Sequence, residues 1–79
     1  MRLDKYLKVS RLIKRRTIAN EACSSGRVLL NGRVAKASAD VKEGDIIEIQ
    51  FGAKTSKFQV KSIQVTSKKE EAKELYKYL

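Results

Sequence analysis

The sequence contains no histidine, proline or tryptophan, and it has a single cysteine, Cys23. Without histidine it cannot supply the usual ligand set of a zinc site or a Ser-His or Cys-His nucleophile pair. One thiol also excludes an intramolecular disulfide. The four glycines (Gly26, Gly32, Gly44 and Gly52) are isolated, so there is no glycine-rich phosphate loop. We identify no catalytic constellation and expect a protein that is not an enzyme and uses no metal or cofactor.

Long apolar runs are missing as well. The longest uninterrupted run of Leu, Ile and Val is Val28-Leu29-Leu30, far short of the roughly 20 residues of a membrane-spanning helix. The stretch MRLDKYLKVSR carries charges at every second or third position and has no apolar signal-peptide centre. We therefore expect a cytoplasmic location.

Positive charge is what the sequence has, and it is unevenly distributed. The net charge is +9; residues 1–36 contain ten Lys and Arg residues but two acids, whereas residues 37–79 contain eight lysines and seven acids. Every arginine lies in residues 1–36. The planar guanidinium suits phosphate groups and base edges, and a bound polyanion relieves the repulsion among such charges. Nucleic acid is the partner that this pattern favours.

Two helices are predicted near the N-terminus. Over residues 2–9, Leu3, Tyr6 and Leu7 follow helical spacing, which places Tyr6 in the core and not against a base. A second helix is predicted from about residue 15 to residue 25, ended by Gly26 as a left-handed cap. Its buried face is expected to consist of Ile18, Ala19, Ala22 and Cys23.

The period then changes to that of strands. Asn31-Gly32 lies between two short apolar runs and predicts a β-hairpin. Alternating apolar residues predict a strand ending at Phe51 and a further strand through Phe58 and Val60. Ala72, Leu75, Tyr76 and Leu79 stand at helical spacing in the tail. The expected fold is α+β, with two N-terminal helices on a small antiparallel sheet, a domain over residues 1–66, and a C-terminal amphipathic helix or tail over residues 67–79.

The stretch SRLIKRRT, Ser10 to Thr17, conflicts with a general property of helices. A first helical turn exposes unpaired N–H groups and favours anions, yet the second helix opens with Lys14, Arg15 and Arg16. A bound phosphate would accept from the N–H groups and pair with the guanidinium groups. We interpret this stretch as a phosphate site; the alternative is a solvated basic turn.

Arg2, Lys5, Lys8 and Arg11 form a second basic row along the first helix, which is either part of the same patch or an ordinary solvated face. Asp4 has two interpretations. It can stabilise the first turn and pair with Lys8 at i+4, or it can orient an arginine such as Arg16 toward RNA.

A third group of polar residues lies on and after the hairpin: Arg27, Asn31, Arg33 and Lys36. Asn31 is assigned to the turn, because a type I′ turn needs positive φ at both central positions. Arg33, just beyond the turn, is expected to contact RNA. RNA is favoured over DNA because the sequence has no long basic recognition helix with a dimer element, and structured RNA is bound through shape and phosphates.

The pieces RLDKYL, SR, KRRT, GRVLLNG and V..GD.I.I, within residues 2–49, resemble the αL-motif RNA-binding domain named after the fourth protein of the small ribosomal subunit. The resemblance implies that two helices and a hairpin form one RNA-binding face. On this chain the matching positions are Arg2, Asp4, Lys5, Arg11, Arg15, Arg16, Arg27, Asn31 and Arg33.

Within that family the chain is similar to the small bacterial ribosome-associated quality-control factors and to the fifteen-kilodalton heat-shock proteins. This implies a monomer that binds ribosomal RNA of the large subunit and peptidyl-tRNA, and that supports alanine tailing by a NEMF-type quality-control factor. The heat-shock relatives carry a longer basic C-terminal extension, which this chain lacks. We therefore expect it to belong with the quality-control factors.

Three alternatives remain open at this stage. They are a heat-shock factor that recycles ribosomes, an architectural DNA-binding protein, and a protein-interaction adaptor that docks a partner through the last helix.

Overall fold

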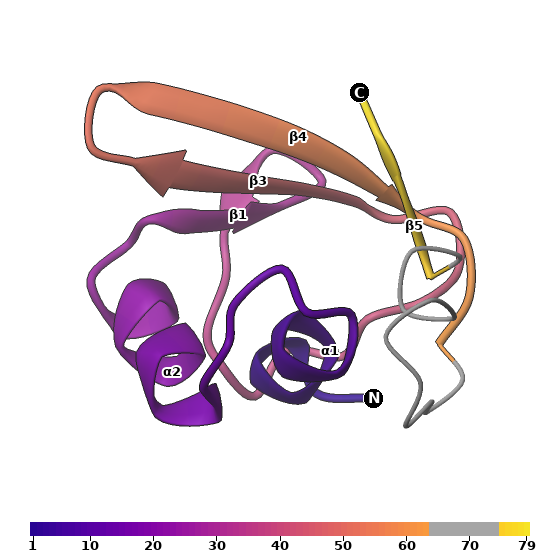
Figure 1. Ribbon diagram of the computed structural model, residues 1–79, viewed down its shortest axis with the longest axis horizontal. Coiled ribbons are helices and arrows are strands. Elements are labelled where there is room, and N and C mark those ends of the chain that lie inside the picture. The colour runs from indigo at the N-terminus through magenta and orange to yellow at the C-terminus, as the bar shows by residue number, and fades with distance from the viewer. Residues whose placement is uncertain (64–74) are drawn as a thin grey trace.

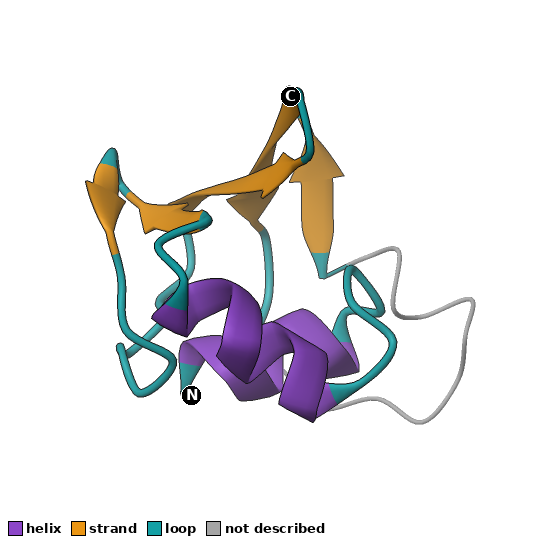
Figure 2. Cartoon of the chain, turned by 90° about the vertical axis from the view of Figure 1, so that its left-hand side faces the viewer, coloured by secondary structure: helices purple, strands orange, loops and turns teal. Residues whose placement is uncertain are grey.

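The computed structural model describes residues 1–63 and 75–79, and it has two layers. Helices α1 (Leu3–Val9) and α2 (Arg16–Ser24) form one layer and cover one face of a β-sheet (Figures 1 and 2). The predicted α+β fold is confirmed. Neither helix of the described ranges is long and apolar enough to cross a membrane.

The sheet has five antiparallel strands in the order β2-β1-β3-β4-β5. Their bounds are Val28–Leu30 for β1, Arg33–Val34 for β2, Ile46–Phe51 for β3, Lys54–Val60 for β4 and Tyr76–Tyr78 for β5. The predicted hairpin is β1–β2, in which Leu30 pairs with Arg33. Asn31 has φ 53° and Gly32 has φ 83°, the positive values that a type I′ turn requires.

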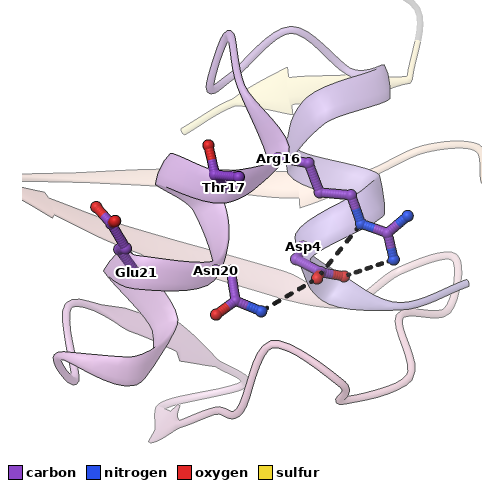
Figure 3. Close-up of a pocket in the computed structure, with 5 residues that line it drawn as sticks. All are labelled: Asp4, Arg16, Thr17, Asn20 and Glu21. Atoms are coloured by element: carbon purple, nitrogen blue, oxygen red, sulfur yellow. Dashed lines mark hydrogen bonds and ion pairs between the residues drawn. The ribbon is translucent and has the colours of Figure 1, made fainter.

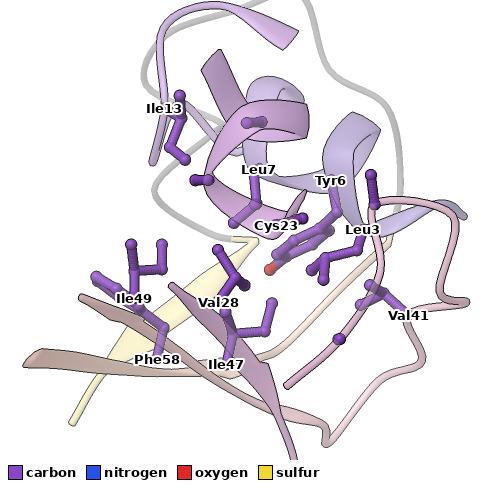
Figure 4. Close-up of a cluster of buried hydrophobic side chains, with 14 of the residues drawn as sticks. Leu3, Tyr6, Leu7, Ile13, Cys23, Val28, Val41, Ile47, Ile49 and Phe58 are labelled. Atoms are coloured by element: carbon purple, nitrogen blue, oxygen red, sulfur yellow. The ribbon is translucent and has the colours of Figure 1, made fainter. Parts of the chain in front are cut away.

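The core lies between the two layers (Figure 4). From α1 it receives Leu3, Tyr6 and Leu7, each with 0% of its surface exposed, and from α2 the small residues Ala19, Ala22 and Cys23. Strands β3 and β4 contribute alternate residues, among them Ile47, Ile49, Phe58 and Val60. Because the buried side chains of α2 are small, its axis can approach α1 closely. The assignments of Tyr6 and Cys23 to the core are confirmed.

The segment after β2 returns along the start of α1. The Leu3 N–H donates to the Ala39 carbonyl at 2.8 Å, and the Asp4 N–H donates to the Ala37 carbonyl at 3.1 Å. These bonds satisfy two of the N–H groups that a helix start leaves free. They also hold residues 35–39 beside Arg2, which precedes α1.

Two sequence predictions require correction. Tyr76–Tyr78 is strand β5, where Tyr76 pairs with Val60 and Tyr78 with Phe58, so the predicted C-terminal helix does not extend over these residues. The edge of the sheet supplies backbone partners that outweigh a helical spacing of only a few apolar side chains. Ala72 and the boundary between residues 66 and 67 lie outside the described residues. Leu75 is buried, so it is not available as a docking face for a partner.

Ile18 is the second correction, because 48% of its surface is exposed. Ala19, Ala22 and Cys23 define a narrow buried stripe at i, i+3 and i+4, and Ile18 lies one residue to the side of it. Its side chain borders a surface hollow together with Ile13, Lys14 and Arg15.

Tyr6 connects the helical layer to the C-terminal strand. Its hydroxyl donates to the Leu75 carbonyl at 2.6 Å within the core, and burial raises the pKa of this phenol above its usual value. We expect Tyr6→Phe to lower the free energy of unfolding by about 1 kcal/mol, because one buried hydrogen bond is lost without a cavity. Urea unfolding measures the change. Tyr78→Phe is the control: its hydroxyl is exposed, and a loss as large as that of Tyr6→Phe would contradict the prediction.

Candidate nucleic-acid interface

The site is built around a carboxylate in the first turn of α1. Asp4 is only 2% exposed, and it receives two guanidinium groups. Arg2 donates from Nε to Asp4 Oδ1 at 3.2 Å and from Nη2 to Oδ2 at 3.3 Å. Arg16, the first residue of α2, lies 3.4 Å from Asp4 through both Nε and Nη2. Two cations on one carboxylate leave a net positive charge at this point of the surface.

Two further donors complete the environment of Asp4. The Lys5 N–H donates to Oδ1 at 2.8 Å, and Asn20 Nδ2 lies 3.5 Å from Oδ2. Burial raises the pKa of this carboxyl group, but the hydrogen bonds from Arg16, Asn20 and Lys5 and the charge of Arg16 lower it more. The net pKa lies below the ordinary value, so Asp4 is ionised at neutral pH and holds both arginines in place.

A surface hollow of about 410 Å³ opens beside this carboxylate, and we call it the Asp4 hollow. It is bordered by Asp4, Arg16, Thr17, Asn20 and Glu21. Figure 3 shows Arg16 and Asn20 turned toward Asp4, while Glu21 extends away from it. Arg16 is about half exposed, so its guanidinium can pair with Asp4 and still meet an anion from solvent.

The start of α2 is basic and uncapped. Arg15 is the N-cap residue and makes no side-chain cap bond, and no acid stands in the first turn. The first N–H groups of α2 are therefore without the side-chain acceptor that such positions usually have. The predicted conflict between local charge and helix polarity is present in the structure.

Arg11 adds backbone strain at the end of α1. Its φ is 63°, and its N–H donates to the Lys8 carbonyl at 3.0 Å, which is the geometry of a left-handed helix end. Glycine usually occupies this conformation, because a Cβ raises its energy by about 1–2 kcal/mol. An arginine here stabilises the fold less than glycine would, which is typical of residues kept for a functional contact.

The other predicted positions separate into two groups. Within residues 1–63 and 75–79, no ion pair involves the side chains of Lys5, Lys8, Arg11, Lys14, Arg15, Arg33 and Lys36. These side chains are exposed. In this part of the chain Lys8 does not pair with Asp4. Asp4 lies in the first turn of α1, as the first interpretation requires, and contacts Arg16, as the second requires. Its role toward RNA stays a prediction.

Arg27 and Asn31 have local partners. Arg27 Nε donates to Ser25 Oγ at 2.8 Å. Asn31 Nδ2 donates to Asp45 Oδ1 at 3.2 Å, and Asn31 Oδ1 accepts from the Ile46 N–H at 2.9 Å. Both ends of this amide are used to join the hairpin to β3, which agrees with its assignment to the turn.

Comparison with known proteins identifies the family of the chain. The family model described as S4 domain matches residues 1–47, which include both helices, β1, β2 and the start of β3. The chain belongs to the S4 domain family. The resemblance inferred from the sequence motifs is confirmed.

Several relatives of this S4 domain protein align with it over most of their own length. A protein of Bacillus subtilis (strain 168) is 56% identical over 79 residues, 100% of this chain and 92% of the relative, and is named RQC P-site tRNA stabilizing factor. A protein of the same name from Halalkalibacterium halodurans is 57% identical over 76 residues, 96% of this chain and 86% of the relative. The trimeric structure of heat shock protein 15 from Vibrio cholerae matches with a TM-score of 0.91 and 31% identity, over 100% of this chain and 81% of that one.

Asn20 is the site residue that sequence reasoning missed. It stands one helical turn after Arg16 and bonds to the same carboxylate, so it belongs to the contact between α1 and α2. The available signal is weak: asparagine is a poor former of helix interiors, and its presence in the middle of α2 indicates a side-chain hydrogen bond.

Stability should depend on pH through Asp4. Because the folded-state pKa of Asp4 is lowered, its contribution to stability is present above the ordinary value of 3.8 and is lost as pH falls through the folded-state pKa. Asp4→Asn should destabilise the fold by about 1–3 kcal/mol at pH 7 and make the acid side of the profile flatter. Thermal unfolding between pH 7 and pH 2 measures both. Glu43→Gln is the control, since that carboxylate is exposed and belongs to no ion pair within residues 1–63 and 75–79; a profile as steep in Asp4→Asn as in wild type would contradict the role of Asp4.

Exchange of Arg11 separates stability from binding. Arg11→Gly removes the strain of the left-handed backbone and should raise the free energy of unfolding by about 0.5–1 kcal/mol, while it removes one cation from the interface. Arg11→Ala removes the same charge and keeps the strain. Both variants should bind RNA more weakly than wild type, and only the glycine variant should be more stable. Equal stability of the two variants would rule out strain at Arg11.

Proposed function

We propose that this protein is a non-catalytic RNA-binding factor of the large ribosomal subunit that acts in rescue and quality control of stalled translation in the cytoplasm. The helical layer binds ribosomal RNA and peptidyl-tRNA. Bound there, the protein supports alanine tailing of the nascent chain by a NEMF-type partner.

The observation that carries the proposal is the pairing of Arg2 and Arg16 on buried Asp4. Arginines held by a carboxylate lose less side-chain freedom when they meet a phosphate, so the binding site is organised before RNA arrives. The uncapped start of α2 extends the same surface, as do the cations around it that have no acid partner among residues 1–63 and 75–79.

The relatives add the biological setting. The proteins from Bacillus subtilis and Halalkalibacterium halodurans are named for stabilising a P-site tRNA, and both align with nearly the whole of this chain. Alignment over nearly the whole chain, a shared S4 domain and identity above one half support the same role here.

The experiment that tests the proposal is co-sedimentation with purified large subunits, with and without bound peptidyl-tRNA, over a salt series. A protein that contacts about six phosphates should lose on the order of a thousandfold in affinity between 50 and 200 mM salt. Arg16→Ala should weaken binding by roughly tenfold or more, because a charge-assisted hydrogen bond is lost. Subunits with peptidyl-tRNA should bind the wild type more tightly than empty subunits.

Lys57→Ala is the matched control. It removes the same charge from β4, where Lys57 pairs with Glu48 at 3.3 Å, and it should leave binding nearly unchanged. If Arg16→Ala and Lys57→Ala reduce binding equally, total charge and not the helical layer determines affinity. If duplex DNA binds as well as the subunit at the same salt, the protein is a general polyanion binder.

A further inference from the structure

We infer that a groove between α2 and the segment after β2 receives one unpaired nucleotide of the bound RNA, with the base against Arg2 and the phosphate near Lys36. The inference rests on the proposed RNA-binding function and names a structural feature of the RNA. We call this feature of the surface the Lys36 groove.

The Lys36 groove has a volume of about 540 Å³, which is in the range of small-molecule sites. The floor of the groove is formed by buried small residues, Cys23, Ala35 and Ala37. Its rim is exposed and polar or charged, and includes Arg2, Ser24, Lys36 and Ser38. Apolar walls below a cationic rim match a nucleotide, which has an apolar base face and an anionic phosphate.

The Arg2 side chain borders the groove and is held by Asp4. Asp4 accepts hydrogen bonds from Nε and Nη2 of Arg2 in a fork arrangement. These two bonds hold the guanidinium group beside the groove. A guanidinium held by its edge still offers its planar face. Proteins recognise unstacked RNA bases by stacking them on aromatic side chains or on arginine planes, and the described lining of this groove contains no aromatic residue.

The segment after β2, which also lines the groove, offers hydrogen-bond donors. The backbone N–H groups of Lys36, Ala37 and Ser38 donate to no acceptor within the described residues, although the Ala37 carbonyl accepts from α1. Of these three residues only Ala37 is buried, and a buried backbone donor usually has a partner. The Lys36 side chain, which has no acid partner in the same described part of the chain, adds a positive charge to this segment.

The Lys36 groove and the Asp4 hollow share Asn20, and the carboxylate of Asp4 lies between Arg2 and Arg16. One strand of RNA can therefore meet Arg16 through a phosphate and continue toward Arg2 and Lys36. A base in a continuous duplex is stacked and cannot enter the groove, whereas a bulged or looped base can.

The test compares two fluorescent RNA hairpins that differ by one bulged uridine. In anisotropy titrations at fixed salt, the wild type should bind the bulged hairpin roughly tenfold more tightly than the fully paired one, the effect of one stacked base. Ser24→Gln places a longer neutral side chain at the rim and should reduce the ratio to about one. Arg2→Lys keeps the charge but loses the planar face, and it should reduce the ratio as well.

Thr55→Gln, at an exposed position of β4 outside the groove, is the matched control and should keep both affinities. Thermal unfolding shows whether each variant is folded. Equal binding of both hairpins by the wild type, or a ratio kept in folded Ser24→Gln, would overturn the groove assignment while salt-dependent binding to large subunits stands. If the wild type binds neither hairpin and does not bind the large subunits, the proposed function is overturned as well.

Discussion

The rest of the proposed binding surface depends on one buried negative charge. Asp4 lies in the first turn of α1, and its carboxylate reaches Arg2, Arg16 and Asn20, so it joins α1 to α2 and sets the positions of two guanidinium groups. The first 36 residues contain ten cations and two acids, so Asp4 is one of only two carboxylates in this part of the sequence that can hold a cation in position. The exposed heads of the arginines limit its cost, because the pair is only partly removed from water.

Three local features of the helical layer disagree with what a helix favours on its own. The start of α2 is basic and has no cap, Arg11 adopts a left-handed backbone, and the cations around them have few acid partners. Each feature reduces the stability of the isolated protein, and all three concern residues 8–16. Local rules are most often broken at functional sites. A polyanion resolves all three at once, since it neutralises the charges and supplies acceptors to the free N–H groups.

The fold could be predicted from the sequence because the signals for its elements are local. Asn31-Gly32 predicts a hairpin because both residues readily adopt the positive φ that its turn requires. The alternation of Ile47 and Ile49 predicts a buried strand face. The tail was predicted less well, because Leu75 and Tyr76 have spacing compatible with a helix and the sheet edge that pairs with them is remote in sequence. The same limit applies to the site. Charge segregation indicated the arginines, but the contacts of Asn20, Ala37 and Ala39 with α1 arise only when the chain folds back.

The two edge strands of the sheet are short, and the two longest strands lie in its interior. β2 has two residues and β5 has three, whereas β3 and β4, in the interior, have six and seven. Arg33 and Lys77 add a charge to each edge. An edge of this kind exposes few backbone groups in register and repels a second copy, which is how natural sheets avoid strand-to-strand aggregation. The protein can therefore expose a strongly basic face to a partner, while the edges of its sheet do not favour pairing with strands of other chains.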